Sequence, residues 1–278
     1  MTSDPALSLR IVLLGAGRVA SQLAPALHQA GHQVAGIWSR SPGTAAALAA
    51  TLPNVPSLPT LDLTSLPSAD VYLLAVPDAA IPAVLAQAHF PAGALVAHTS
   101  GAVPLSVFES TAGIVGGVFY PLQTFSAERT VDWRTVPLCV EGATPTAQLT
   151  LLALGHTLSG SVQPVGTPQR QAIHIAAVFA CNFTNHLLGI SHALLQQQQL
   201  PLALLAPLLQ ETMEKALAHP PFTVQTGPAA RHDAPTLARH RAALASHPAW
   251  LDVYNSLTSS IQEQLVPSLI NNQGGVEL

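Results

Sequence analysis

A row of polar side chains interrupts the apolar stretch "QRQAIHIAAVFACNFTNHLL" in the second half of the sequence. At 3.6 residues per turn the row lies close to one helical face, and its members are Arg170, His174, Cys181, Asn182 and Asn185. Imidazole titrates near neutrality, which suits it to donate a proton to a reacting heteroatom. We therefore expect His174 to be a catalytic acid and Asn182 to orient it. The alternative is a core histidine bonded to a neighbouring helix.

The segment "LLGAGRVASQL" has the spacing Gly15-x-Gly17-x-x-Ala20 between an apolar run and a helix-like run. The first glycine permits a tight turn, the second lets the backbone approach a pyrophosphate, and the small Ala20 allows close helix packing. This pattern predicts a dinucleotide site, and the alternative is a glycine-rich turn without a ligand. The expected contacts are Gly15, Ala16, Gly17, Arg18 and Val19.

The next apolar run ends in "WSRS", where an enzyme that uses NAD would carry a carboxylate for the ribose hydroxyls. Ser39, Arg40 and Ser41 instead supply a guanidinium and two hydroxyls, which suit a 2′-phosphate. Arg18 is expected to add a second cation nearby. The segment favours NADP over NAD, and the alternative for Arg40 is an ordinary solvated arginine.

Two further loops follow apolar runs and are expected at the same ligand-binding edge. The first contains Val76, Pro77 and Asp78, which would flank the cofactor, with Asp78 capping the next helix. The second, "HTSGA", offers Thr99 to the cofactor and Ser100 as an orienting group in catalysis. The alternative for Thr99 and Ser100 is simple capping of a turn.

A loop in the second half of the chain, "VQTGPAARHDAP", directly precedes a helix-like segment. Asp233 is suited to cap that helix, and Arg231 is suited to clamp a carboxylate. The alternative is an ordinary capped loop between helices.

Short apolar runs alternate with helix-like segments through the first part of the chain. The runs are 10–15, 34–38, 71–76, 94–98, 114–118, 136–141 and 161–165, and the segments between the first of them are 19–30, 43–51 and 79–88. This order predicts a parallel sheet covered on both faces. We expect a doubly wound, Rossmann-like α/β domain in residues 1–165. Residues 166–278 are expected to form an all-helical domain for substrate binding and dimerisation.

Composition excludes several classes of protein. The 278 residues are 49% hydrophobic and 9% charged, with a net charge of −4 and no basic cluster, so a nucleic-acid partner is not expected. No uninterrupted apolar stretch has membrane-spanning length, and we expect a soluble cytoplasmic protein without a membrane partner. Cys139 and Cys181 match no metal spacing, so no metal is expected. Lys215 is the only lysine and lies outside the polar row, which disfavours a lysine acid on that helix.

Several segments in fixed order resemble one family, the NADP-oxidoreductase-like proteins with a Rossmann-like N-terminal domain and a C-terminal domain of unknown function 2520. The segments are "GAGRVASQLA", "AVPDAAI", "HTSGA", "YPLQTFS", "QRQAIHIAAVFACNFTNHL" and "QTGPAARHDAPTLARH". The family is similar to pyrroline-5-carboxylate reductase and to deazaflavin-dependent NADP reductases. The resemblance implies NADP as cofactor and a homodimer formed through the helical domain.

The chain departs from the family pattern around the expected site. The family has His, Asn, Tyr, Ser and Gly where this chain has Tyr120, Arg18, Ile173, Cys181 and His232. These changes predict that the substrate, or even the activity, differs from that of relatives.

These observations together predict an NADP(H)-dependent oxidoreductase. It would move hydride to or from a small carbonyl or imine substrate, with His174 supplying the proton. The alternative is a sensor or partner protein that binds NADP(H) without turnover.

Overall fold

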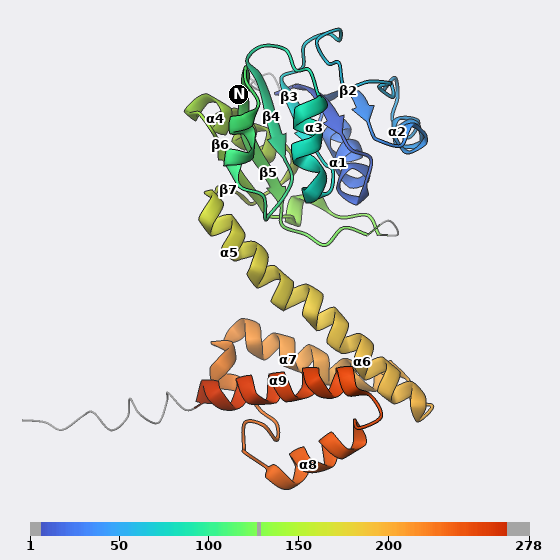
Figure 1. Ribbon diagram of the computed structural model, residues 1–278, viewed down its shortest axis with the longest axis vertical. Coiled ribbons are helices and arrows are strands. Elements are labelled where there is room, and N and C mark those ends of the chain that lie inside the picture. The colour runs from blue at the N-terminus through green and yellow to red at the C-terminus, as the bar shows by residue number, and fades with distance from the viewer. Residues whose placement is uncertain (1–6, 127–128, 266–278) are drawn as a thin grey trace, which may run out of the picture. The chain divides into compact units, whose positions relative to one another are not determined.

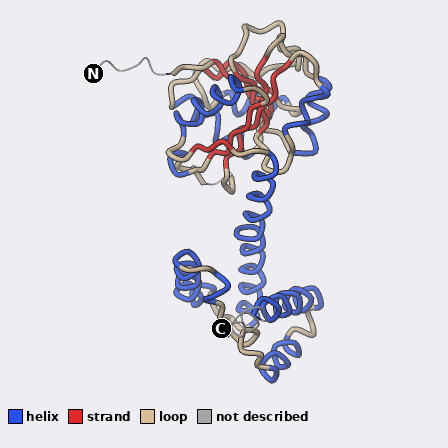
Figure 2. Tube along the Cα trace, turned by 90° about the vertical axis from the view of Figure 1, so that its left-hand side faces the viewer, coloured by secondary structure: helices blue, strands red, loops and turns tan. Residues whose placement is uncertain are grey.

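The computed structural model describes residues 7–126 and 129–265. The chain forms two compact units, Met1–Asn182 and Phe183–Leu278. All described strands lie in the first unit (Figures 1 and 2). The described part of the second unit contains helices and turns only. The predicted fold class, a Rossmann-like α/β domain followed by a helical region, is confirmed.

One seven-stranded sheet forms the centre of the first unit, in the order β2-β1-β3-β4-β5-β6-β7. Its strands are β1 (Arg10–Leu14), β2 (Gln33–Trp38), β3 (Val71–Leu74), β4 (Ala94–His98), β5 (Ile114–Pro121), β6 (Leu138–Gly142) and β7 (Val162–Pro164). Each of the predicted apolar runs overlaps one strand. Strands β1 to β5 are parallel, as expected.

The expectation of a fully parallel sheet is wrong at β6, which pairs antiparallel with β5. The physical reason is the connection between them. A parallel return requires a crossover, usually a helix. Here the described part of the connection contains only a single 3-10 turn, Trp133–Thr135. The chain therefore turns back beside β5, and β7 then pairs parallel with β6.

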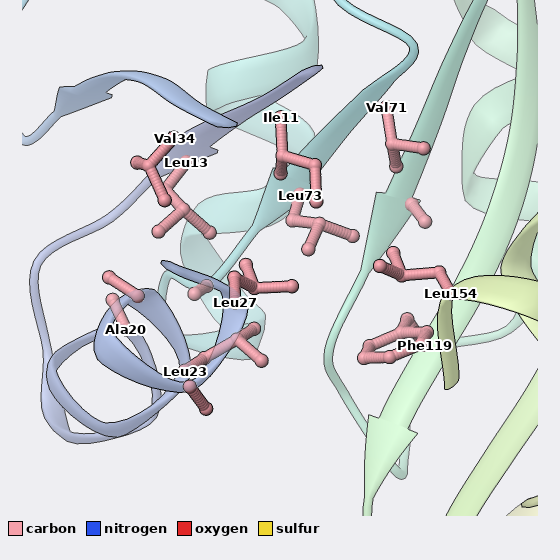
Figure 3. Packing of buried hydrophobic residues seen from close by; sticks show 14 of the residues in the cluster. Ile11, Leu13, Ala20, Leu23, Leu27, Val34, Val71, Leu73, Phe119 and Leu154 are labelled. Atoms are coloured by element: carbon pink, nitrogen blue, oxygen red, sulfur yellow. The ribbon is translucent and has the colours of Figure 1, made fainter. Parts of the chain in front are cut away.

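Alternating side chains of the buried strands contribute to two hydrophobic clusters, one on each face of the sheet. On one face α1 (Arg18–Gln29), α2 (Pro42–Ala49) and α4 (Pro145–Leu158) pack against the sheet. Figure 3 shows Ala20, Leu23 and Leu27 of α1 directed at the strand residues of this cluster. On the other face α3 (Ile81–Gln87) contributes to the second cluster. The sheet is thus covered on both sides, as a doubly wound domain requires.

Helix α1 forms because its apolar positions recur at helical spacing and it starts directly after the glycine turn. Leu23 and Leu27 are fully buried against the sheet. The helix stops because Gly31 adopts a φ of 90°, a conformation that ends helices and favours glycine. Because α1 begins directly after β1 and the glycine turn, its N-terminus lies at the edge where the parallel strands end.

A single long helix, Thr167–Gln197, follows β7 as predicted. It consists of α5 (Thr167–Ala177), a π-helical turn (Val178–Phe183) and α6 (Thr184–Gln197). The compact units divide at the end of the π turn, because the first turns of α5 bond to the sheet unit. The prediction of a boundary at 165/166 instead follows the end of β7 and stays a prediction. The remaining helices are α7 (Ala206–Ala218), α8 (Ala234–Ala243) and α9 (Pro248–Leu265).

In the described part of the chain, one helix is long and apolar enough to cross a membrane by length and composition. It is Thr167–Gln197, with a mean hydropathy of 1.4 over its most apolar window and none of that window buried within the chain. Such an exposed apolar helix needs a covering surface.

Candidate functional site

The glycine turn follows β1 and has the geometry that a close backbone approach requires. Gly15 has a φ of 127°, and a Cβ at this position would lie 2.2 Å from the carbonyl oxygen of Ala75. A larger residue is therefore excluded on both backbone and packing grounds. Gly17, in contrast, is exposed, and a Cβ placed on it would have no neighbouring atom of the described residues within 4 Å. Its open side is where a ligand can approach the backbone.

The N-terminus of α1 at Gly17 is free to receive an anion. No side chain of the described residues caps the helix there, and its first turn carries no acidic residue. The first amides of a helix have no intrahelical partner and carry a partial positive charge. Ala16 and Val19 are half-exposed beside this end, and Arg18 is exposed. The arrangement fits a pyrophosphate, as the glycine spacing predicts.

The corner after β2 carries the residues expected to meet a 2′-phosphate. Arg40 and Ser41 are exposed and Ser39 is half-exposed. The hydroxyl oxygens of Ser39 and Thr44 lie 3.0 Å apart, and Thr44 also donates to the carbonyl of Ser41 at 2.8 Å. Thr44 was not predicted as part of this corner, although its place three residues after Ser41 in "SRSPGT" could have indicated it. The corner thus gathers several hydroxyls beside the guanidinium of Arg40.

The loop after β3 exposes Pro77 and Asp78, with Val76 half-buried. The expectation that Asp78 caps the next helix is wrong. Pro77 occupies the capping position, and Asp78 is the first residue of a 3-10 turn, Asp78–Ala80, which has no side-chain capping bond from the described residues. Its carboxylate is therefore left at the ligand-binding edge. The predicted cofactor contacts of these three residues stay predictions.

The loop after β4 is a tightly bonded turn. The Thr99 hydroxyl donates to the carbonyl of Leu74 at 3.2 Å, and Ser100 Oγ accepts from the amides of Ala102 and Val103 at 3.1 and 3.0 Å. Both side chains are buried. These contacts are the turn capping that was the alternative for both residues. Ser100 keeps its hydroxyl proton for donation. Its catalytic role and the cofactor role of Thr99 both stay predictions.

The backbone of Gly101 brings Tyr120 and His174 together. A Cβ at Gly101 would lie 2.7 Å from His174 Nδ1 and 2.9 Å from the Tyr120 hydroxyl. The hydroxyl and Nδ1 are themselves 3.3 Å apart. Burial raises the pKa of the Tyr120 phenol, and Cys139 and Asp78 add to the rise. The phenol therefore keeps its proton at neutral pH.

Tyr120 is the site residue that the sequence did not assign. It lies near the end of β5, beside β4 in the sheet, so it reaches the edge that also carries the glycine turn and the β4 loop. Its departure from the family pattern was the available signal. His174, the predicted acid, lies beside it, whereas Asn182 lies in the π turn and is exposed. The structure thus brings His174 to the β4 loop, and the orienting role of Asn182 stays a prediction.

A buried ion pair fixes the start of α5. Arg170 is 0% exposed and pairs with Glu141 of β6, which also accepts from the Thr167 amide and hydroxyl at 2.9 and 2.8 Å. Arg170 Nη2 donates to the carbonyl of Val103 at 2.5 Å, and Gln171 donates to Ala102 at 2.9 Å. These bonds, called the Arg170 clasp below, join β6, the β4 loop and α5 one turn before His174. The Arg170 clasp positions His174 over Gly101.

His98 is buried beside this site and contacts the β4 loop from the core. Its ring is 0% exposed, stacks on Phe108 with centroids 5.6 Å apart, and accepts from the Ser100 amide at Nδ1 over 3.2 Å. Burial first, and then the charge of Arg170, lower the pKa of His98 from 6.5 to about 4. The ring is therefore neutral in the folded protein at neutral pH.

Acid should destabilise the fold through His98. Between pH 6.5 and 4 this ring is protonated in the unfolded chain but stays neutral in the folded chain. The stability present above pH 6.5 is therefore lost as the pH falls toward 4. The full loss is roughly 3 kcal/mol. His98→Asn keeps an acceptor for Ser100 but does not titrate. The free energy of unfolding should fall more between pH 7 and pH 4 in the wild type than in this variant. Equal losses in both proteins would show that His98 is not the cause.

The helical unit contains the predicted loop before α8. Asp233 caps α8 by accepting from the Thr236 amide at 3.1 Å, which confirms its expected role. His232 has a φ of 52°, a conformation that favours glycine, in agreement with the glycine expected there from the family resemblance. Arg231 is exposed, and its contact with a carboxylate stays a prediction. In the described part of the chain no cluster of His, Cys, Asp or Glu has the arrangement of a metal site.

The fold and the glycine turn define a dinucleotide-binding type of α/β protein with a helical C-terminal region. Family models match a Rossmann-like domain at residues 3–118 and a domain of unknown function, DUF2520, at residues 136–261. A solved protein of Bacteroides fragilis, described as a candidate NADP oxidoreductase, is 35% identical with a TM-score of 0.82, over 92% of this chain and 98% of that one. The chain belongs to this family of Rossmann-like proteins with a DUF2520 domain.

More distant solved structures share the fold. A reductive aminase from Aspergillus terreus in complex with NADPH and ethyl levulinate is 16% identical, with a TM-score of 0.71 over 98% of this chain and 97% of that one. A 1-pyrroline-5-carboxylate reductase from Streptococcus pyogenes is 14% identical, with a TM-score of 0.58 over 92% and 99%. Among curated proteins the sequence has no match.

Proposed function

We propose that the protein is an NADP(H)-dependent oxidoreductase that transfers hydride to or from a small carbonyl or imine substrate. The observation that carries this proposal is the glycine turn, with its uncapped helix end at Gly17 and a Gly15 that no other residue can replace. The description of the Bacteroides fragilis relative as a candidate NADP oxidoreductase supports it.

The residues present fit NADP in two places. The α1 N-terminus and Gly17 would hold the pyrophosphate. Arg40, with Ser39 and Ser41, would hold the 2′-phosphate, because a guanidinium and hydroxyls donate to phosphate oxygens. The "WSRS" segment offers no carboxylate to ribose hydroxyls, which disfavours NAD. Val76, Pro77, Asp78 and Thr99 would line the path of the cofactor toward the β4 loop.

When bound, the nicotinamide supplies the hydride, and the chain supplies binding, orientation and a proton. In the reducing direction His174 would donate a proton to the substrate oxygen or nitrogen as the substrate carbon accepts hydride. Ser100 would orient the heteroatom with its remaining O–H, and Asn182 is proposed to assist. The alternative of a sensor without turnover predicts NADP(H) binding but no hydride transfer.

We further propose that the protein works as a homodimer formed through its helical domain. Large apolar side chains of this region are exposed in the single chain, among them Leu204, Leu208, Leu217 and Phe222. A second copy would cover them and the exposed long helix. A cytoplasmic location is also proposed, since Cys139 and Cys181 are both free.

Gly17→Ala should separate nucleotide binding from folding. The added methyl meets no atom of the described residues, so the unfolding free energy should change by less than about 1 kcal/mol. It would occupy the approach of the pyrophosphate, and the Kd for NADPH should rise at least tenfold, about 1.4 kcal/mol. Calorimetric titration measures this.

Gly189→Ala is the matched control, since Gly189 lies in α6 and a Cβ placed on it also meets no atom of the described residues. This variant should leave the Kd for NADPH unchanged. If Gly17→Ala also binds NADPH as the wild type does, the turn does not hold the nucleotide and the proposed function fails.

A further inference from the structure

The contact between Tyr120 and His174 has no role in the function proposed so far. We propose that Tyr120 is a positioning residue that occupies Nδ1 of His174, so that Nε2 is the nitrogen that exchanges the proton with the substrate. This inference rests on the proposed function and adds to it the identity of the proton-exchanging atom.

The contact is built by three separate parts of the sheet unit. Tyr120 comes from β5, His174 from α5 and Gly101 from the β4 loop. The hydroxyl lies 3.3 Å from Nδ1, and the rings meet edge to face with centroids 6.2 Å apart. Gly101 leaves no room for a side chain between them. The Arg170 clasp fixes the helix one turn before His174.

A phenol can hold Nδ1 in both charge states of the ring. When the ring is neutral, the O–H of Tyr120 donates to Nδ1, and the ring proton is on Nε2. When the ring is charged, Nδ1–H donates to the phenol oxygen instead. Phenylalanine could do neither, and a carboxylate could only accept. In both states Nε2 is not engaged by the phenol.

The proton balance follows from this arrangement. In the reducing direction the N–H bond at Nε2 of the charged ring breaks, and its electron pair stays on the nitrogen. The proton bonds to the substrate oxygen or nitrogen as the substrate carbon accepts hydride, and the ring is left neutral with its remaining proton on Nδ1, donated to the phenol oxygen. Water then returns a proton to Nε2. Tyr120 keeps its own proton throughout, in agreement with a phenol pKa that burial raises.

The test is the ¹⁵N spectrum of the histidine rings in the full-length protein, at a pH where His174 is neutral. In the wild type we expect the His174 proton on Nε2 and a bare, hydrogen-bonded Nδ1. In Tyr120→Phe the balance between the two tautomers should shift by about fivefold toward Nδ1–H, because the O–H···Nδ1 bond of the Nε2–H tautomer is lost and a phenol oxygen is only a weak acceptor for the other tautomer. The Kd for NADPH should stay unchanged.

A second tyrosine supplies the matched control. Tyr254 makes the same type of contact with Nδ1 of His240, at 2.9 Å, in the helical unit. Tyr254→Phe should change the His240 signals and leave those of His174 as in the wild type. A neutral His174 with its proton on Nδ1, or a spectrum that Tyr120→Phe does not change, overturns the inference. Failure of the wild type to bind NADPH would instead overturn the proposed function.

Discussion

Arg170→Met is expected to lower the free energy of unfolding by about 3–5 kcal/mol, the usual cost of removing one partner from a buried ion pair. The substitution leaves the Glu141 carboxylate, only 17% exposed, without its cation. It also leaves the Val103 carbonyl without the Arg170 donor. Denaturant titration followed by circular dichroism measures the change.

Two comparisons show whether the buried pair is the cause. Arg170→Met combined with Glu141→Gln should recover part of the loss, since the uncompensated charge is removed. Lys215→Met breaks an ion pair with Glu211 whose side chains are 53% and 55% exposed, and it should cost less than about 1 kcal/mol. Similar losses in Arg170→Met and Lys215→Met would show that the Arg170 clasp does not stabilise the fold.

His174→Gln is expected to lower turnover by about 10²- to 10⁴-fold, the usual contribution of a general acid. The amide keeps polar contact with Tyr120 but cannot deliver a proton. Oxidation of NADPH in the presence of a small ketone, alone and with a primary amine, provides the assay, since these probes supply the proposed carbonyl and imine substrate classes. The Kd for NADPH should not change.

His192→Gln is the control for this substitution, because His192 is exposed on α6. It should retain wild-type turnover. Wild-type turnover in His174→Gln would remove His174 from the mechanism. Absence of turnover in the wild type with every carbonyl and imine probe, together with tight NADPH binding, would favour the sensor.

The sheet could be predicted from the sequence because its strands are buried on both faces and therefore read as continuous apolar runs. The direction of β6 could not, since it depends on the course of the connection and not on the apolar pattern. The π turn at Val178–Phe183 also left no signal, because its residues fit an ordinary apolar helix. Local periodicity determines which segments form elements, whereas three-dimensional packing determines how they join.

The candidate site was predictable at positions where the backbone conformation admits only one type of residue. Gly15 is such a case, because its backbone angle excludes other residues. The partner of His174 was not predictable, since Tyr120 lies on another element and meets the ring only through the close approach at Gly101. The prediction for Asp78 was wrong, because Pro77 takes the capping position and Asp78 follows it as the first residue of the 3-10 turn.

The most direct test of the central claim is a calorimetric titration of the wild type and Arg40→Asp with NADPH and NADH. NADPH should bind the wild type at least tenfold more tightly than NADH, a difference of about 1.4 kcal/mol. Arg40→Asp should erase that preference, because it replaces the cation at the 2′-phosphate by a carboxylate suited to ribose hydroxyls. If neither nucleotide binds the wild type, the glycine turn serves only the architecture and the protein is not an NADP(H)-dependent oxidoreductase.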